Sequence, residues 1–172
     1  MKKIDEYTLP RNTVYGVCVF MGMLAGVANS FLAIDFSPSP SLFGWLLAAI
    51  IIVITLHEGV HGAAAALLGH KPLFGLKPPL VYITFTDKIP RGHFILVALA
   101  PFVVLDLLFA LLYVQGALKL FSDLSFIINT IGAVGDVWVV LKLLGAPKGA
   151  LIQDTKTGFE VWTDIDSAEH LS

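Results

Sequence analysis

One long apolar segment of the chain is interrupted by three ionisable residues within five positions. Residues 41–68 are almost entirely hydrophobic, yet they contain His57, Glu58 and His61. Ionisable groups are costly in hydrocarbon, so these three must be paired, bound to a cation or exposed to water. The pattern His-Glu-x-x-His places two imidazoles four residues apart, on one face of a helix. That spacing allows both rings to bind one metal ion, with the carboxylate placed to handle a proton.

The composition is typical of a membrane protein. Hydrophobic residues make up 56% of the chain and charged residues 14%, whereas a soluble domain carries about 25% charged residues. A helical span needs about 20 apolar residues. Four segments meet this requirement, namely residues 13–34, 42–68, 92–118 and 124–144. We therefore expect an all-α membrane protein with four transmembrane helices, in which residues 119–123 form a tight turn.

The positions of lysine and arginine predict how the chain is oriented. With the N-terminus inside the cell, the inside segments hold ten of the eleven Lys and Arg residues, and the outside loops hold only Lys119. Positively charged residues concentrate in the cytoplasmic loops of membrane proteins. We therefore expect a multi-pass protein of the cell membrane whose N- and C-termini are both cytoplasmic.

Two segments outside the spans favour β structure. Residues 80–86 alternate and are rich in β-branched and aromatic residues, which predicts a short strand between the second and third spans. A peptide substrate can join the edge of such a strand and would then lie near Tyr82 and Thr84; a structured loop is the alternative. Residues 150–162 predict a small hairpin, within a polar tail that comprises residues 150–172. The chain then divides into a four-span membrane domain, residues 1–149, and a cytoplasmic tail.

A catalytic zinc site takes three protein ligands and one water, so a third ligand is expected on another span at the same depth. At ~1.5 Å per residue from the cytoplasmic helix ends, Asp136 lies level with the two histidines and Asp106 lies deeper. We therefore predict one zinc ion per chain, held by His57, His61 and Asp136, with Asp106 as the reserve ligand. Iron and cobalt also suit these ligand types. Asn129, on the same helix face as Asp136, is a candidate for binding a substrate backbone or for a hydrogen bond between helices.

These residues resemble an intramembrane metalloprotease of the site-2 protease type. The resemblance consists of His57-Glu58-x-x-His61 on one span and an aspartate, within Gly135-Asp136, on a later one. That superfamily usually shows an Asn-Pro stretch ending in Asp-Gly, where this chain has Asn129 and the order Gly-Asp. The sequence is more similar to the zincin peptidase family of small bacterial multi-pass membrane proteins. The similar segments are residues 56–62, 98–102, 135–138, 148–149 and 154–162.

The motif and the resemblance together predict an intramembrane zinc endopeptidase with Glu58 as the general base. Its partners would be a membrane-associated peptide or protein substrate and the lipid bilayer, and no basic run indicates nucleic acid. The alternative is a non-catalytic membrane module that binds a metal or a partner. A structural zinc site is closed by four protein ligands, so His93 or Asp106 on the metal would favour that alternative. Metal transport is disfavoured, because the sequence offers no second series of ionisable residues across the outer half of the membrane.

Overall fold

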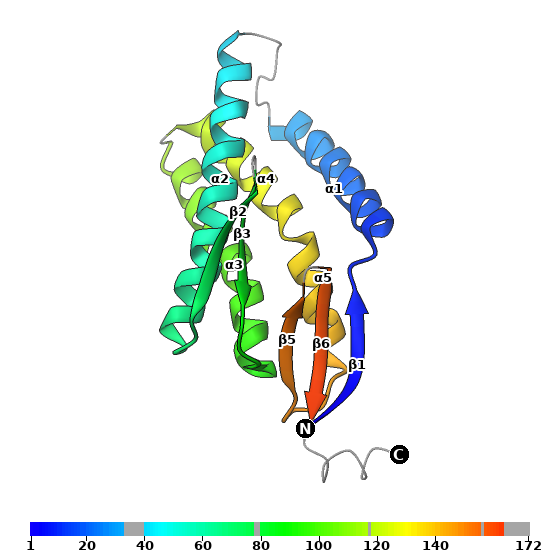
Figure 1. The fold of residues 1–172 in the computed structure, drawn as a ribbon. Coiled ribbons are helices and arrows are strands. Elements are labelled where there is room, and N and C mark those ends of the chain that lie inside the picture. Colours follow the sequence, from blue (N-terminus) through cyan, green and yellow to red (C-terminus); the bar gives the residue numbers. More distant parts are fainter. Residues whose placement is uncertain (33–39, 78–79, 117, 156, 164–172) are drawn as a thin grey trace.

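The structure is a computed structural model of the chain, and it describes residues 1–32, 40–77, 80–116, 118–155 and 157–163. It is mostly helical, with two small sheets (Figure 1). The elements are β1 (Lys2–Thr8), α1 (Arg11–Leu32), α2 (Pro40–Leu67), β2 (Pro72–Lys77), β3 (Leu80–Phe85), β4 (Ile89–Pro90), α3 (Arg91–Val114), α4 (Lys119–Gly132), α5 (Val134–Leu144), β5 (Leu151–Thr155) and β6 (Gly158–Thr163).

Three helical segments of the described residues are long and apolar enough to cross a membrane. They are Ser41–Leu67, Arg91–Val114 and Lys119–Leu144. Large apolar side chains such as Ile51, Val103 and Leu107 are more than half exposed on these helices. Such a surface is unfavourable in water and suits contact with lipid. The first predicted span coincides with α1 as far as Leu32 and then leaves the described residues, so the count of four spans stays a prediction.

The fourth predicted span consists of two helices that meet at Ala133. The N–H of Ala133 donates to the carbonyl of Asn129, and the N–H of Val137 donates to Ala133, so helical hydrogen bonding continues through the junction. The expected turn at residues 119–123 is wrong, because these residues form the start of α4. The chain reverses just before them, where Gly116 has a φ of 77° that glycine adopts without strain and that ends α3.

The strand predicted at residues 80–86 is confirmed as β3, and it has an antiparallel partner, β2, that was not predicted. Pro72 of β2 lies opposite Phe85. The hairpin packs closely on α2, where Gly62 leaves room for it. A β-carbon at position 62 would lie 2.6 Å from the ring of Phe74 and 3.0 Å from the side chain of Ile83. The small residue on α2 therefore lets the hairpin approach the helix that carries the His-Glu-x-x-His motif.

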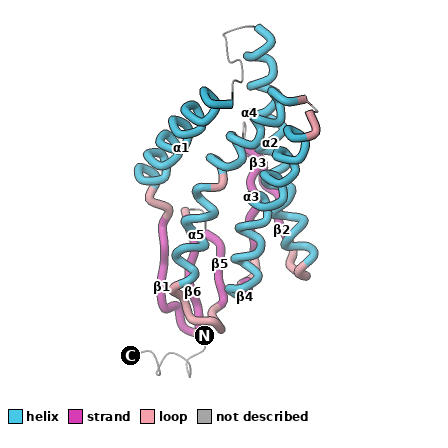
Figure 2. Tube along the Cα trace, turned by 180° about the vertical axis from the view of Figure 1, so that it is seen from behind, coloured by secondary structure: helices cyan, strands magenta, loops and turns pink. Residues whose placement is uncertain are grey.

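The hairpin predicted in the tail is confirmed as β5 and β6, and it belongs to a larger sheet with the order β1-β6-β5-β4. Figure 2 shows β1, β6 and β5 together at the end of the molecule that also holds the N-terminus. Strand β1 pairs with β6, and β4 pairs with β5. Residues on both sides of the predicted boundary at 149 therefore lie in one sheet. Phe159, Ile152 and Val161 of this sheet are buried against α3 and α5.

Arg91 links α3 to α5 at the ends of these helices that are nearest to the sheet. It begins α3, and its guanidinium donates hydrogen bonds of 2.6 Å and 3.1 Å to the carbonyls of Leu143 and Leu144 at the end of α5. Carbonyls of the last helical turn have no partner within the helix, and a cation there is favourable. The bond therefore holds the sheet-side ends of α3 and α5 together, and α5 carries Asp136.

Candidate metal centre

Three potential ligand atoms converge between α2 and α5. His57 and His61 lie one turn apart on α2, and Asp136 lies in the first turn of α5. His57 Nε2 is 3.0 Å from Asp136 Oδ2, and His61 Nε2 is 3.5 Å from Asp136 Oδ1. One ligand atom of each residue lies within 4.8 Å of the others. The structure thus brings together the three residues that the sequence predicts as ligands.

The ring of His61 is held by a hydrogen bond on its Nδ1 side. Nδ1 lies 2.8 Å from the carbonyl oxygen of Val97 in α3. A carbonyl oxygen only accepts, so Nδ1 carries the proton and donates it. In a neutral ring, Nε2 then keeps its lone pair, and this is the atom that faces Asp136. A metal-binding histidine is oriented in this way, with its second nitrogen bonded to a fixed acceptor.

Asn129 of α4 orients His57 in the same way. Its side chain is fully buried, and its Nδ2 donates to the carbonyl of Pro101 at 3.1 Å and to Asp106 Oδ1 at 2.8 Å. Its Oδ1 is therefore the acceptor that faces His57 Nδ1 at 2.9 Å, and the proton of His57 lies on Nδ1. Of the two roles expected for Asn129, the hydrogen bond between helices is the one that the structure contains.

Asp106, the reserve ligand, lies apart from the ligand group. Its Oδ1 accepts the hydrogen bond from Asn129, and its Oδ2 accepts one of 2.8 Å from the hydroxyl of Thr130. Both oxygens are therefore bonded to side chains of α4. Asp106 reaches the ligand group only through Asn129, which it helps to orient towards His57.

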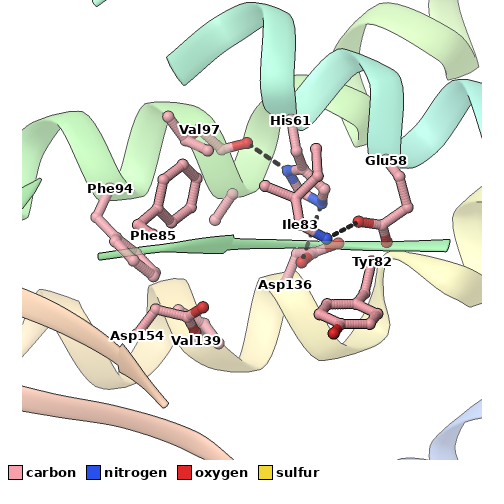
Figure 3. Close-up of a pocket in the computed structure, with 11 residues that line it drawn as sticks. Glu58, His61, Tyr82, Ile83, Phe85, Phe94, Val97, Asp136, Val139 and Asp154 are labelled. Carbon is pink, nitrogen blue, oxygen red and sulfur yellow. Dashed lines mark hydrogen bonds and ion pairs between the residues drawn. The ribbon is translucent and has the colours of Figure 1, made fainter. Parts of the chain in front are cut away.

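Glu58 follows His57 on α2, and its carboxylate reaches the backbone of β3. The N–H of Ile83 donates to Glu58 Oε2 at 3.0 Å. Figure 3 shows this carboxylate on the same side of α2 as His61, with β3 running past both side chains and Asp136 close to them. A carboxylate in this place can exchange a proton with a water held beside the ligand group.

Two cavities meet at the ligand group. The smaller, of about 220 Å³, extends along β3 and α3, and the larger, of about 630 Å³, lies between α2 and α4. Both cavities are lined by Glu58, His61, Tyr82 and Asp136. Tyr82, predicted as a substrate contact, is therefore placed where it faces both spaces. The ligand group lies at the junction of the two cavities and is accessible from either.

Asp154 of β5 also lines the smaller cavity, a position that no sequence motif predicts. Its Oδ2 accepts a hydrogen bond of 2.7 Å from the hydroxyl of Thr84, the other predicted substrate contact. Burial raises the pKa of the Asp154 carboxyl above its ordinary range, although hydrogen bonds from Thr84 and from the backbone of Phe85 and Thr155 act in the opposite direction. No local pattern predicts this placement, because it depends on β5 packing beside β3, 70 residues earlier.

The ligand group fits zinc by chemistry and by spacing. Two neutral imidazoles and one carboxylate form a usual catalytic donor set. In a tetrahedral site with zinc–ligand bonds of about 2.0–2.1 Å, ligand atoms lie roughly 3.3 Å apart. The observed separations of 3.0 Å and 3.5 Å between the histidine nitrogens and Asp136 bracket that value. A dication would also balance the two carboxylates of Asp136 and Glu58, which otherwise share a poorly solvated place.

Comparison with known proteins identifies a family that shares this part of the chain. The family described as "Putative zincin peptidase" matches residues 50–151, which include the whole ligand group. A protein of Pyrococcus woesei, described as "Uncharacterized 24.7 kDa protein in gap 5'region", is 28% identical over 159 residues, which is 88% of this chain and 71% of that protein. No solved structure matches. Because the family match spans more than half of the chain, the protein belongs to this zincin-type peptidase family.

Proposed function

We propose that the chain is a zinc-dependent intramembrane endopeptidase that hydrolyses peptide bonds in membrane-associated peptides or proteins. The observation that carries this proposal is the convergence of His57, His61 and Asp136, with Glu58 beside them, on helices apolar enough to cross a membrane. Zincin-type family membership supports the peptidase activity and the choice of zinc. Placement of the ligand group within candidate spans supports a substrate that is itself in the membrane.

The roles of the side chains follow from their geometry. When bound, zinc would lower the pKa of a water and polarise the scissile carbonyl. His57 and His61 present the unprotonated Nε2 that a ligand must have, and Asp136 supplies an oxygen to each side of the group. Glu58 accepts a proton from the attacking water and donates it to the amine that leaves.

The strand β3 supplies a surface for an extended substrate. A helical segment hides its carbonyls in internal hydrogen bonds, so the scissile bond becomes accessible only when the substrate unwinds locally. A strand edge offers the unwound segment replacement hydrogen bonds. Tyr82 and Thr84 lie on this strand, and the larger cavity between α2 and α4 leads to it through the ligand group. We therefore propose that Tyr82 contacts the substrate.

The sheet supports four spans and the expected orientation. Strands β1, β4 and β6 belong to one sheet and so lie on one side of the membrane. Two helices, α1 and α2, separate β1 from β4. If α2 crosses, α1 must cross as well to return the chain to the same side. The excess of Lys and Arg at this side favours a cytoplasmic location, so we propose that the N-terminal and the C-terminal strand are both cytoplasmic.

A non-catalytic metal module remains the second candidate, and the number of protein ligands separates the two. Within the described part of the chain, the potential ligand group contains three residues, which leaves a position for water. His93, a possible fourth ligand, instead lies against His70, with 2.9 Å between His93 Nδ1 and His70 Nε2. These contacts favour the catalytic proposal.

Substitution of single residues in the site tests this proposal. In cells that express Glu58→Gln, fragments of membrane proteins made by the wild-type chain should fall by about 100-fold or more, because the general base is lost. Purified Glu58→Gln should still contain zinc, whereas Asp136→Ala should lose it. Elemental analysis and proteomics of new peptide termini measure the two effects, with Glu6→Gln as an exposed control. Wild-type levels of fragments from Glu58→Gln would exclude Glu58 as the base.

A further inference from the structure

The edge of β3 that faces away from β2 carries two backbone donors, the N–H groups of Ile83 and Phe85. In an antiparallel pair, alternate residues direct their N–H groups to opposite edges of the strand. The N–H groups of Ile83 and Phe85 both point away from β2. The N–H of Ile83 donates to Glu58 at 3.0 Å, and the N–H of Phe85 donates to the carboxylate of Asp154. Pro72, opposite Phe85, has no N–H to donate and does not need one there.

Two carboxylates therefore occupy the positions that the carbonyls of an added substrate strand would take. A substrate carbonyl that accepts the hydrogen bond from the N–H of Ile83 would displace the carboxylate of Glu58. That carboxylate is then free to contact the attacking water. A second carbonyl that bonds to Phe85 releases Asp154. Because these two donors are two residues apart, about 6.6 Å along the strand, Asp154 lies roughly two substrate residues from the bond next to Glu58.

The charges around the smaller cavity indicate which kind of substrate group Asp154 would then contact. Among the described residues, those that line the smaller cavity include three acids, Glu58, Asp136 and Asp154, and neither Lys nor Arg. A dication balances two of these carboxylates and leaves the charge of Asp154 without a cation. A released carboxylate in a partly buried cavity is unfavourable unless an opposite charge or a hydrogen-bond donor reaches it.

We propose that Asp154 is a specificity-determining residue that selects substrates with a Lys or Arg side chain about two residues from the scissile bond. This inference rests on the proposed function, because it concerns the substrate of the same site. In the free protein, Asp154 bonds to Thr84 and Phe85 and holds the strand edge closed. In the complex, the cationic side chain of the substrate replaces both partners.

A binding experiment tests the inference without requiring hydrolysis. The probes are fluorescein-labelled Leu/Ala membrane peptides with a central Gly-Gly pair, each with a single Lys at one position of a scan, and the same peptides with norleucine. They are titrated against the full-length, zinc-loaded wild-type chain in detergent, and the dissociation constant is read from the initial fluorescence anisotropy, before any peptide is cut. At one position, Lys should strengthen binding roughly tenfold over norleucine, as for a charge-assisted hydrogen bond.

A substitution of Asp154 tests whether this residue causes the preference for Lys. Asp154→Asn keeps the shape and a hydrogen-bond acceptor but removes the charge, and it should abolish the preference for Lys. Asp87→Asn, which changes an exposed aspartate just after β3, should preserve it. The inference is overturned if no position of the scan favours Lys when residue 154 is Asp, a result that does not depend on a variant folding. A preference that survives in Asp154→Asn also overturns it.

The same peptides separate this inference from the proposed function. Incubation with the wild-type chain, followed by mass spectrometry, shows whether they are cut. A preference for Lys that depends on Asp154, without any cleavage, would retain Asp154 as the selecting residue and count against hydrolysis. Cleavage that is indifferent to Lys would retain the peptidase and reject the role of Asp154.

Discussion

At the scale of single residues, the site depends on which nitrogen of each histidine carries the proton. The carbonyl of Val97 and the side chain of Asn129 each accept a hydrogen bond from an Nδ1, and both Nε2 atoms are left to face Asp136. Asn129 can only accept from His57 because its own amide group donates to Pro101 and Asp106. A buried network in which every group is bonded specifies one arrangement.

This network predicts that Asn129→Ala weakens zinc binding although position 129 is not a ligand. Loss of the acceptor frees the ring of His57 to rotate or to change its protonated nitrogen. Losses of about 10–100-fold in metal affinity are usual for such supporting residues. Competition with a chelator measures the affinity of the purified protein.

Thr130→Val is the matched control for this prediction. It removes a hydrogen bond to Asp106 on the side away from His57, and should leave zinc affinity close to that of the wild type. Equal affinities of wild type and Asn129→Ala would show that the ring of His57 is oriented by something else.

At the scale of secondary structure, the contact between α2 and the β2–β3 hairpin brings Glu58, the proposed general base, to the edge of β3. Gly62 makes this contact possible, because its missing side chain leaves space for Phe74 and Ile83. Gly59 lies on the same helix, and a β-carbon there would meet nothing within 4 Å. The two glycines therefore differ in their surroundings while sharing the helix that carries the motif.

We predict that Gly62→Leu displaces the hairpin from α2. A leucine side chain cannot fit between them, and overpacking of this kind costs about 1–3 kcal/mol. Amide hydrogen exchange in residues 82–85 should become roughly tenfold faster or more, since the bond from Ile83 to Glu58 opens more often.

The matched variant Gly59→Leu adds the same side chain where there is room, and exchange in residues 82–85 should stay at the wild-type rate. Mass spectrometry of the exchanged protein in detergent measures both. Unchanged exchange in Gly62→Leu would mean that the hairpin does not depend on close packing against α2.

At the scale of the whole molecule, the sheet constrains the topology of the helices. Strands from the beginning, middle and end of the chain pair with one another, so the helices between them must leave the sheet side and return to it. Lys119, at the start of α4, lies at the far end of this path.

Labelling of single cysteines tests this topology, with the native Cys18 replaced by alanine. A membrane-impermeant maleimide added to intact cells should label Lys119→Cys and should not label Lys2→Cys or Thr157→Cys, all three of which are exposed positions. Permeabilised cells provide the control in which all three react. Labelling of Lys2→Cys and Lys119→Cys from the same side of intact membranes would contradict four spans.

Local patterns in the amino-acid sequence were enough to predict several features of the fold and of the site. Apolar runs of sufficient length predicted α2, α3 and the α4–α5 segment, and alternation with β-branched residues predicted β3 and the terminal hairpin. The spacing of His57 and His61, and the depth of Asp136, predicted a single ligand group whose atoms the structure brings together. These inferences succeed because helix rise and side-chain periodicity are properties of short segments.

Contacts between distant segments could not be predicted from local patterns and became visible only in the folded chain. The pairing of β1 with β6, the bond from Asn129 to His57, and the placement of Asp154 beside Thr84 each join residues far apart in the chain. No periodicity encodes such contacts, since many strands and polar side chains are compatible with each partner. They are selected together, by the packing of helices around buried polar groups that must all find hydrogen bonds.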